Sequence, residues 1–352
     1  MIFPLTPFIL SLLPLTSALV KSPFGDKALK GFNFGPESDF ATEFKAIKNT
    51  PGIKDFTSAK LFTSIAPGTT NKPLDAAFRA AQENEFSLLL GIWASGSETH
   101  VDDEIAAIKA AMNADYGKDV FSKRIVGIIV GSEDLYRRSK IGTADEGKLE
   151  DLGLAPDIII KYIDKVRTEL STTPYANKIP VGHADTWGSW MNDAEGGKVM
   201  EHVDFIALNG FPYWEQQQAS WGKFNWEGAL KVTKDAAQRH KNNGEVVPVW
   251  STETGWPAAG PDCGKSKPGK ENAQIYWKTV GCDVQFGKIS SWWFQYKGEG
   301  AQQGVDKDLQ WGVVDAQGNP FYPLSCDAEL PEEVLPTKGA TCGTNEAKQP
   351  GT

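Results

Sequence analysis

The chain has 352 residues and a formal net charge of −9, from 36 Lys and Arg against 45 Asp and Glu. Its 40% hydrophobic and 23% charged residues are typical of a globular protein and exclude a disordered or collagen-like chain. The acidic balance, without any basic block, argues against sequence-independent binding to nucleic acid or to an anionic membrane surface.

The first predicted element is a secretory signal peptide over residues 1–18. This segment is apolar and ends in the small residues Thr16-Ser17-Ala18, as a signal peptide does before its cleavage site. An N-terminal membrane anchor is the alternative, but prolines interrupt the run, which is short for a span of about 20 apolar residues. We expect a mature chain that starts near Leu19 or Lys21, and a secreted, extracellular protein that could associate with the cell wall.

Eight short β-rich runs follow, and each precedes a longer stretch of helix-compatible composition. Several of the runs are almost continuously apolar, which is typical of parallel strands covered on both faces. In chain order, the predicted strands lie within Gly31–Gly35, Ser58–Thr63, Ser87–Trp93, Ile125–Glu133, Ile179–Thr186, Phe205–Trp214, Val246–Trp256 and Ile289–Tyr296.

Between these runs lie amphipathic stretches with apolar residues at helical spacing, such as Val101–Met112, Asp157–Leu170 and Trp226–His240. The alternation of strand and helix predicts an α/β protein, a single-domain (β/α)8 TIM barrel over residues 19–326, followed by an irregular tail over 327–352. A doubly wound open sheet is the competing fold, but the first run lacks the G-x-G-x-x-G turn that such a sheet more often carries.

Two glutamates stand where strand runs end, Glu133 in the fourth run and Glu253 in the seventh. A barrel places its active site at the C-terminal ends of its strands, so both side chains should reach the mouth. Paired carboxylates suit the cleavage of a glycosidic bond, one as proton donor and the other as nucleophile or as the base that activates water. The alternative is that either glutamate is a buried acid paired with Arg or Lys. Asp185 is a weaker candidate, and Asp204, which precedes its strand, suits the opposite face.

Aromatic residues gather at the strand ends and could bury the C–H faces of sugar rings while the sugar hydroxyls stay free. Asn209 and Tyr213 could contact those hydroxyls, although Asn209 could equally be a turn residue before Gly210. The alternative is that about half of these aromatic residues belong to the core. The set comprises Trp93, Phe211, Tyr213, Trp214, Trp256, Trp292, Trp293 and Tyr296.

The four cysteines, none in a C-x-x-C pair, are Cys263, Cys282, Cys326 and Cys342. An even number in a secreted chain favours disulfides, and four cysteines allow three pairings. We favour Cys263–Cys282 and Cys326–Cys342, because these pairs close the shortest loops. The four histidines are scattered along the chain, so the sequence indicates no metal site.

Six short motifs occur in order between about residues 30 and 326: Gly31–Gly35, Leu90–Trp93, Val130–Glu133 with Tyr136-Arg137, Asn209–Trp214, Ser251–Pro257 and Trp311–Val313. Together they resemble the motifs of the fungal branch of glycoside hydrolase family 17, the β-1,3-glucanases. Ser251–Pro257 resembles the nucleophile motif of that family, and Val130–Glu133 resembles its acid/base motif. One such motif would be moderately specific, whereas six in register are a strong signal.

The resemblance implies a retaining mechanism in which Glu133 is the general acid/base and Glu253 the nucleophile. It also implies that Asn209, Phe211 and Tyr213 line the subsite where the bond breaks. The substrate-binding residues that we predict are Phe62, Trp93, Ser132, Asn209, Phe211, Tyr213, Trp256 and Trp293.

The chain departs from the pattern of plant members, which usually carry Asn at the position of Ser132 and often Tyr at that of Phe211. Both changes look like the fungal pattern. Lys60-Leu61-Phe62 stands where Arg-hydrophobic-Tyr is common, and the eighth-strand loop Gln295–Glu299 departs from the acidic type. We therefore expect altered contacts at the subsite and unusual affinities on the leaving-group side.

These observations predict a secreted β-1,3-glucan hydrolase working by double displacement, with endo cleavage favoured, on a laminarin-like or cell-wall glucan. Two alternatives stay open: a β-1,3-glucanosyltransferase, in which a second glucan attacks the covalent intermediate, and an inactive glucan-binding wall protein. No metal or organic cofactor is expected, because two carboxylates suffice. We expect a monomer whose partner is the glucan, with no nucleic-acid or membrane partner.

Overall fold

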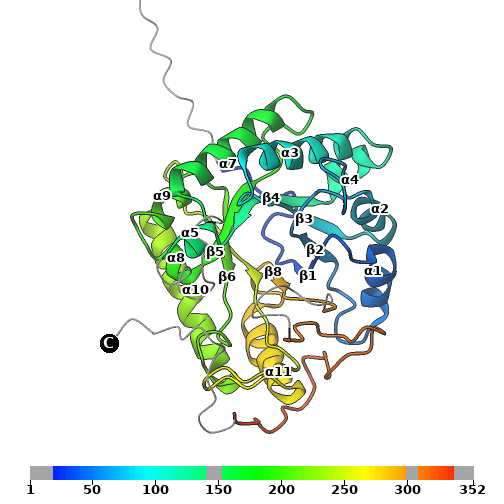
Figure 1. Cartoon of the computed structure of the whole chain (residues 1–352), viewed down its shortest axis with the longest axis vertical. Coiled ribbons are helices and arrows are strands. Elements are labelled where there is room, and N and C mark those ends of the chain that lie inside the picture. The colour runs from blue at the N-terminus through cyan, green and yellow to red at the C-terminus, as the bar shows by residue number, and fades with distance from the viewer. Residues whose placement is uncertain (1–18, 140–152, 299–307, 337–352) are drawn as a thin grey trace, which may run out of the picture.

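A computed structural model describes residues 19–139, 153–298 and 308–336 of the chain (Figure 1). Figure 1 shows the strands gathered at the centre with the helices around them. Three predictions fall outside the described residues: the signal peptide over 1–18, the part of the tail from 337 to 352, and Glu299 of the eighth-strand loop.

The strands form one closed parallel barrel in chain order. The barrel closes where the last strand pairs with the first, with Phe32 opposite Trp293. Each predicted run overlaps one of these strands, and the first strand begins one residue before its run, so the predicted (β/α)8 barrel is confirmed. The strands are β1 (Lys30–Phe34), β2 (Ser58–Leu61), β3 (Ser87–Ile92), β4 (Ile125–Ser132), β5 (Val181–Thr186), β6 (Phe205–Asn209), β7 (Val249–Glu253) and β8 (Ser291–Trp293).

The three predicted helices are confirmed, with shifted ends. The helix predicted over Val101–Met112 begins at Glu98, because the Ser97 side chain caps it by accepting a hydrogen bond from the His100 N–H. No helix of the described residues is long and apolar enough to cross a membrane. The helices are α1 (Phe40–Asn49), α2 (Asp75–Asn84), α3 (Glu98–Met112), α4 (Gly117–Lys123), α5 (Asp134–Arg138), α7 (Pro156–Ser171), α8 (Trp187–Trp190), α9 (Gly196–Met200), η2 (Ala219–Trp221), α10 (Gly222–Arg239), α11 (Lys270–Tyr276) and η3 (Trp277–Gln285).

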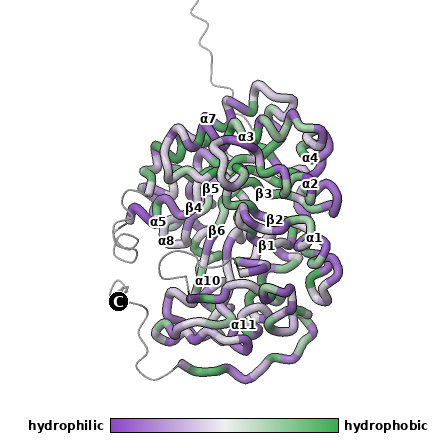
Figure 2. Tube along the Cα trace, turned by 45° about the vertical axis from the view of Figure 1, so that its right-hand side comes forward, coloured by the Kyte–Doolittle hydropathy of each residue, from purple (hydrophilic) through white to green (hydrophobic). Residues whose placement is uncertain are grey.

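Two hydrophobic layers hold the barrel together. The larger layer lies between the strands and the helices. Figure 2 shows the surrounding helices alternating between hydrophobic and hydrophilic colours, as amphipathic helices must when one face packs on the strands. The smaller layer fills the barrel interior with the apolar side chains of Leu29, Leu89, Val126, Ile129, Ala184, Phe205, Ala207 and Trp292.

Polar side chains lie above the apolar filling of the barrel, towards the C-terminal ends of the strands. Side chains along a strand alternate between its two faces, so Asn209 shares the inner face with Ala207, two residues earlier. Asn33 and Lys60 lie at comparable positions of β1 and β2 and are paired in register. All three side chains are buried. The strands therefore build a polar floor at the barrel mouth.

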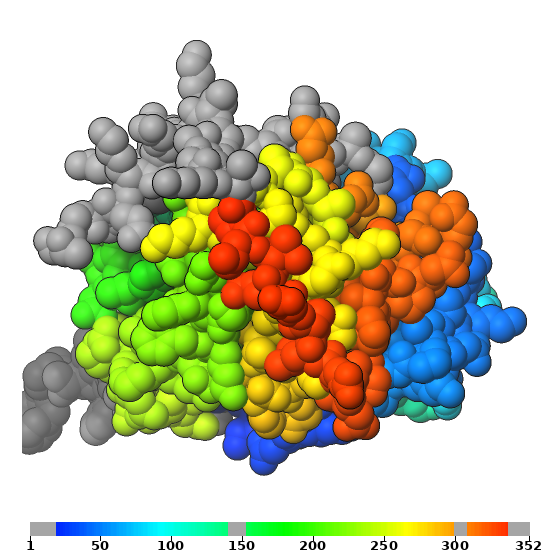
Figure 3. Space-filling model, turned by 90° about the horizontal axis from the view of Figure 1, so that it is seen from below, coloured from blue at the N-terminus to red at the C-terminus, as the bar shows by residue number. Residues whose placement is uncertain are grey.

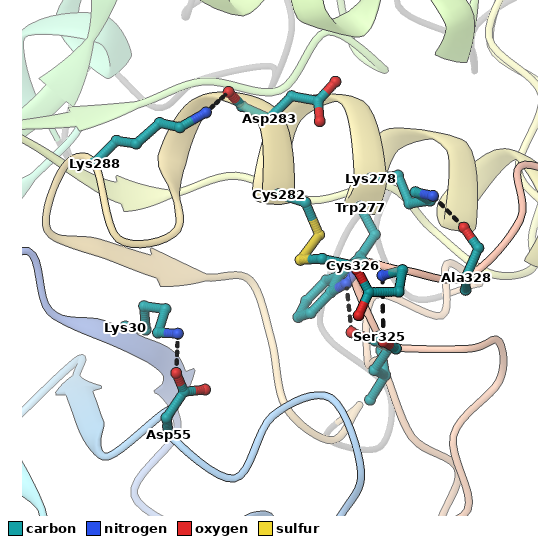
Figure 4. Close-up of a disulfide and its surroundings, with 12 residues drawn as sticks. Lys30, Asp55, Trp277, Lys278, Cys282, Asp283, Lys288, Ser325, Cys326 and Ala328 are labelled. Carbon is teal, nitrogen blue, oxygen red and sulfur yellow. Dashed lines mark hydrogen bonds and ion pairs between the residues drawn. A yellow bond between two sulfur atoms is a disulfide. The ribbon is translucent and has the colours of Figure 1, made fainter.

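One disulfide of the described residues joins Cys282 to Cys326, so both predicted pairings are wrong. The prediction was based on the length of the loop that each pair would close. Which cysteines actually lie close together depends on how the elements that carry them pack. Figure 4 shows η3, which carries Cys282, lying against the segment around Cys326. The Nε1–H of Trp277 donates to the Leu324 carbonyl at 3.0 Å and holds that segment in place. Cys263 is also disulfide-bonded, and Cys342 lies outside the described residues.

The described part of the predicted tail contains no helix or strand. It is nevertheless fixed to α11. Asn272 exchanges two hydrogen bonds with the backbone of Val334, at 2.7 and 2.9 Å, and the Gln274 side chain donates to the Glu329 carbonyl at 2.9 Å. Figure 3 shows this segment, in red, as a strip across the surface of the barrel.

Candidate active site

Glu133 stands at the junction between β4 and α5, in an unusual backbone conformation. Its φ of 60° lies in the left-handed region, which residues other than glycine rarely adopt. Its N–H donates to the Ala184 carbonyl of β5 at 2.8 Å, so the neighbouring strand holds the strained turn. Gly131 is needed nearby, because a Cβ there would lie 2.1 Å from Asp134 Oδ2. Backbone strain of this kind is common at functional sites.

Asn209 connects Glu133 with the end of β7. Its Nδ2 donates to Glu133 Oε1 at 3.1 Å and to Ser132 Oγ at 3.2 Å. Its Oδ1 accepts from the Thr252 hydroxyl at 2.8 Å. In the β6–β7 register Asn209 is also the partner of Glu253. The predicted residues Glu133, Ser132, Asn209 and Glu253 therefore lie together at the mouth of the barrel.

Glu253 is paired with a buried lysine. Lys60 Nζ lies 2.5 Å from Glu253 Oε1, and the Lys60 residue is only 2% exposed. The same ammonium donates to Asn33 Oδ1 at 3.0 Å. Asn33 Nδ2 lies within hydrogen-bond distance of backbone carbonyls of β7 and β8, which orients its oxygen towards Lys60. The ion pair places a buried positive charge against the Glu253 carboxyl group.

Glu133 is in the opposite electrostatic situation. Burial, followed by the negative charge of Glu253, raises the pKa of Glu133 to about 7. The charge of Arg137 and the hydrogen bond from Asn209 oppose this rise in pKa. Glu133 as a whole residue is half-buried. Near pH 7, the raised pKa of Glu133 keeps a large fraction of its carboxyl groups protonated, while the lysine lies beside the other carboxyl group of the pair.

Aromatic side chains form one wall of the site. Phe62 and Phe211 both contact Phe294, with ring centroids 6.1 and 5.4 Å apart, and Trp311 packs 5.2 Å from Phe211. Phe62, Phe211 and Phe294 are half-buried, so part of each ring faces solvent. Trp93 is 36% exposed and lies beneath the guanidinium of Arg137, at 5.0 Å.

Residues 33–311 match the sequence model of the BtgE/BtgC glycoside hydrolase domain. The chain belongs to this family. The predicted relationship to fungal glycoside hydrolases is confirmed.

This member of the BtgE/BtgC glycoside hydrolase domain family is similar to fungal proteins. It is 37% identical over 312 residues to the probable glucan endo-1,3-beta-glucosidase eglC of Aspergillus oryzae, covering 86% of this chain and 64% of that relative. It is 26% identical over 296 residues to the glucan 1,3-beta-glucosidase of Saccharomyces cerevisiae, covering 82% of this chain and 86% of the yeast protein. The chain thus spans less than two thirds of the Aspergillus oryzae relative.

The barrel of this family member is also found in solved structures. A glycoside hydrolase family 17 beta-1,3-glucanosyltransferase from Rhizomucor miehei has a TM-score of 0.65 at 23% identity, over 85% of this chain and 98% of that one. A beta-1,3-glucanase and allergen of Cryptomeria japonica pollen has a TM-score of 0.61 at 16% identity, over 85% and 100%. At these identities the likeness concerns the fold.

Three predicted substrate-binding residues of this family member are core residues in the structure, each 1% exposed: Tyr213, Trp256 and Trp293. Trp293 packs 4.9 Å from Trp277 of η3, on the outer face of β8. Trp256 donates its Nε1–H to the Lys267 carbonyl and packs 5.5 Å from Tyr213. Fully buried rings cannot stack on a sugar, so the structure does not bring these residues to the site.

The sequence interpretation missed Phe294 and Asn33 as site residues. Side chains along a strand alternate between its two faces, so Phe294 shares the inner face with Trp292. The sequence did not show that Trp292 points inward, so this position of Phe294 was not predicted. Lys60 carried a clearer signal, since it is a charged residue inside an otherwise apolar strand. Such a position requires a partner.

Asp185 and Asp204, the other two candidate acids, make contacts that hold elements of the barrel together. Asp185 is fully buried and accepts from the N–H of Leu135 at 2.9 Å, which anchors α5 directly after Glu133. Asp204 accepts from the N–H of Val181, the first residue of β5, at 2.9 Å and pairs with Arg167 at 2.8 Å. It therefore lies at the opposite face, as predicted. Among the described residues, no three His, Cys, Asp or Glu side chains are grouped as a metal site would require.

Proposed function

We propose that this chain is a retaining, endo-acting β-1,3-glucan hydrolase in which Glu133 is the general acid/base and Glu253 the nucleophile. The observation that carries the proposal is the contrast between the two carboxyl groups. Glu133 has a raised pKa, while Glu253 is paired with Lys60. Two carboxyl groups whose environments differ in this way support the assignment of one as acid and the other as nucleophile. The descriptions of the Aspergillus relatives support β-1,3-glucan as the substrate and endo cleavage as the mode.

In the first step, the protonated carboxyl of Glu133 gives its proton to the glycosidic oxygen. Glu253 attacks the anomeric carbon, the C–O bond to the leaving sugar breaks, and a glycosyl ester forms on Glu253. Ester formation removes the negative charge that raises the pKa of Glu133. Glu133 therefore becomes a carboxylate when the second step needs a base. It then takes a proton from water, whose oxygen displaces Glu253 and releases the sugar.

The test replaces each glutamate with alanine and adds azide as an external nucleophile. On an unactivated β-1,3-glucan, Glu133→Ala should lose about 10²- to 10⁴-fold in rate. With a donor whose leaving group needs no proton, azide should restore turnover of this variant and give the β-glycosyl azide, because the nucleophile is still Glu253. Azide with Glu253→Ala should instead give the α-glycosyl azide, because azide then attacks directly.

Circular dichroism of both variants controls for loss of fold. Near-normal activity of either variant on the unactivated glucan, or the opposite azide stereochemistry, would show that the roles are assigned wrongly.

A glucanosyltransferase is the second candidate. The half-buried rings of Phe62, Phe211 and Phe294 give the site an apolar wall that would disfavour water over a second sugar as acceptor. Products from a single β-1,3-gluco-oligosaccharide, separated by chromatography at early times, distinguish the two. Only shorter products support the hydrolase, and products longer than the substrate support the transferase.

We also propose that the protein is secreted. The Cys282–Cys326 disulfide supports this, since disulfides persist in oxidising compartments. Expression of the whole chain in a fungal host should place the protein in the medium or on the wall. Retention in the cytosol would contradict it.

A further inference from the structure

We propose that His183 and Asp185 of β5 form a buried ion pair that positions the general acid/base Glu133 from the side away from the substrate. The proposal rests on the proposed function, which gives Glu133 its role. Both side chains are 0% exposed, so neither can touch a glucan. Ala184, which lies between them, faces the barrel interior, so the pair faces the surrounding helices. His183 and Asp185 are therefore positioning residues that act on the reaction through Glu133.

Three consecutive residues of β5 hold the turn that carries Glu133. Their contacts, in chain order, are His183 Nδ1 with the Val130 carbonyl at 2.7 Å, the Ala184 carbonyl with the Glu133 N–H at 2.8 Å, and Asp185 Oδ2 with the Leu135 N–H at 2.9 Å. The chain is thus fixed three residues before Glu133, at Glu133 and two residues after it. The backbone of Glu133 cannot move without breaking at least one of these contacts.

The turn needs this support because its backbone is irregular. The β4–β5 register shifts between Ile129 and Ser132, so the regular ladder is interrupted just before Glu133. Gly131 and Glu133 have φ of 76° and 60°, in the left-handed region. Such conformations persist where the surrounding structure over-determines them. The two side chains of the pair supply hydrogen bonds to the chain on either side of Glu133.

The hydrogen-bond pattern fixes the charge of the pair. The Val130 carbonyl can only accept a hydrogen bond, so His183 Nδ1 carries a proton. His183 Nε2 lies 3.3 Å from Asp185 Oδ2, and a hydrogen bond there needs a second proton. The Asp185 oxygens already accept from the N–H groups of Leu135 and Thr186, at 2.9 and 2.8 Å, which is the pattern of a carboxylate. The second proton therefore lies on His183, and its ring is a cation.

The surroundings of His183 stabilise this cation. Burial on its own lowers the pKa of His183, but the hydrogen bond to Asp185 and the charges of Asp185 and Asp134 raise it above its usual value. Asp134 of α5 is also fully buried, and burial raises its own pKa. Its Oδ1 accepts from the Ser95 hydroxyl. Trp190 of α8 packs against the imidazole ring, with centroids 5.7 Å apart, and helps to exclude water.

The charge of Asp185 also acts on Glu133. Burial raises the pKa of Glu133 most, followed in order by the effects of Glu253, which raises it, Arg137 and Asn209, which lower it, and Asp185, which raises it. The His183 cation lies against Asp185 and opposes the last of these effects. The two members of the pair therefore influence the acid in opposite directions. Asp185 favours the protonated form of Glu133, and His183 limits that effect.

The pH dependence of kcat/KM on one β-1,3-gluco-oligosaccharide tests the pair. In the wild-type protein the alkaline limb should follow Glu133, near pH 7. Asp185→Asn removes the negative charge, so the limb should move to lower pH by about half a unit to one unit. His183→Gln leaves Asp185 without its cation, so the limb should move to higher pH by a similar amount.

Each substitution keeps hydrogen-bonding groups of the original side chain. The amide of Asp185→Asn can accept from Leu135 and donate to a neutral His183, and the amide of His183→Gln can donate to the Val130 carbonyl. His202→Gln, at an exposed histidine, is the matched control and should keep the wild-type limb. Limbs that stay in place in both variants, or that move in the same direction, would assign the pair a packing role and overturn the proposal.

A measurement on the unmodified protein decides the matter when a variant does not fold. The chain has four histidines, and nuclear magnetic resonance with isotope-labelled histidine reports which of their ring nitrogens carry protons. The signal of His183 is the one that remains after the other three, His100, His202 and His240, are replaced by glutamine. Both ring nitrogens of His183 should be protonated at the pH of maximal kcat/KM. A neutral ring at that pH would overturn the proposal.

Failure of the proposed function looks different. In that case the wild-type protein would convert no oligosaccharide, or Glu133→Ala would stay active, whatever the charge of His183. An active protein that loses its activity in Glu133→Ala, with a protonated His183 and opposite shifts of the alkaline limb, supports both proposals. The same protein without the opposite shifts overturns the ion pair alone.

Discussion

Asn209 is the residue on which the arrangement of both glutamates depends. Its oxygen accepts from Thr252 and its nitrogen donates to Glu133, so the hydrogen-bond pattern fixes the orientation of the amide. Rotation of the amide would turn its oxygen towards the Glu133 carboxylate. Because Thr252 precedes Glu253, one buried side chain aligns the acid with the strand that carries the nucleophile.

The pH dependence of the reaction should follow Glu133. The first step needs its protonated form, so the rate should fall as pH rises through about 7, the pKa of Glu133. The hydrogen bond from Asn209 lowers this pKa, and its loss in Asn209→Ala should raise it. We expect the alkaline limb of kcat/KM to move to higher pH in Asn209→Ala, with a lower maximal rate.

A pH profile on one oligosaccharide checks this expectation. Thr252→Val, which removes only the hydrogen bond that orients Asn209, should shift the limb less and in the same direction. A limb that stays in place or moves to lower pH in Asn209→Ala would show that Asn209 does not control the acid.

Lys60 should matter for the chemical step more than for substrate binding. Lys60→Met removes the only charge that the described structure pairs with Glu253 and leaves that carboxylate in a buried place. We expect kcat to fall by about 10²- to 10³-fold, the cost typical of losing one preorganised electrostatic contact. Lys60→Arg keeps the charge and should retain more activity. Steady-state kinetics of both variants decide this, and equal losses would assign Lys60 a packing role.

At the scale of elements, β8 shows where prediction from sequence stops. The strand itself was predictable, because its run is apolar and bounded by a turn. The facing of its side chains was not, since Trp292, Trp293 and Phe294 are all aromatic and show no alternation. Only the register with β1 settles that Trp293 packs outward on η3 and that Phe294 contacts Phe211.

The two neighbouring rings should respond differently to mutation. Trp293→Phe leaves unfilled space in the layer between β8 and η3, and should lower the free energy of unfolding by about 1–3 kcal/mol with kcat/KM unchanged. Phe294→Ala removes part of the site wall and should lower kcat/KM by about tenfold, mostly through KM. Urea unfolding and kinetics on one oligosaccharide separate the effects. The reverse pattern would place Trp293 in the site.

The loops after strands were the least predictable elements. Tyr213 and Trp256 stand at strand ends in the sequence, where aromatic residues suit a sugar site. In the structure their loops fold back and the two rings pack on each other, 5.5 Å apart, under the surface. A sequence records that a residue follows a strand, but it does not record which way the loop then turns. The positions of Glu133 and Glu253 were predictable, because Glu133 directly follows β4 and Glu253 is the last residue of β7.

At the scale of the whole molecule, the barrel was predictable from the alternation of strand and helix, whereas the disulfide was not. The shortest loops suggested Cys263–Cys282, but a ring of strands brings residues together that are far apart in the chain. Cys282 and Cys326 are 44 residues apart and join η3 to the segment that follows the barrel. Long-range pairing of this kind depends on the completed fold.

Removal of this disulfide should affect stability rather than catalysis. The double variant Cys282→Ser with Cys326→Ser releases a loop of 44 residues in the unfolded chain. The free energy of unfolding should fall by about 2–4 kcal/mol. The active-site contacts of Glu133 and Glu253 include neither cysteine, so kcat/KM at ambient temperature should be unchanged. Denaturant unfolding and kinetics check both, and a large loss of kcat/KM would mean that the crosslink also shapes the mouth.

The Lys60–Glu253 pair also bears on how the protein is made. Its two members are 193 residues apart, and synthesis proceeds at about 5–20 residues per second, so the lysine emerges from the ribosome well before its counter-ion exists. During that interval a closed core would bury an uncompensated ammonium, which is strongly unfavourable. In a nascent chain that ends before β7, the uncompensated charge of Lys60 therefore opposes burial of the barrel interior. Once Glu253 has been synthesised, it can pair with Lys60 and offset this cost. Closure of the barrel additionally requires β8, which follows Glu253 in the chain and pairs with β1.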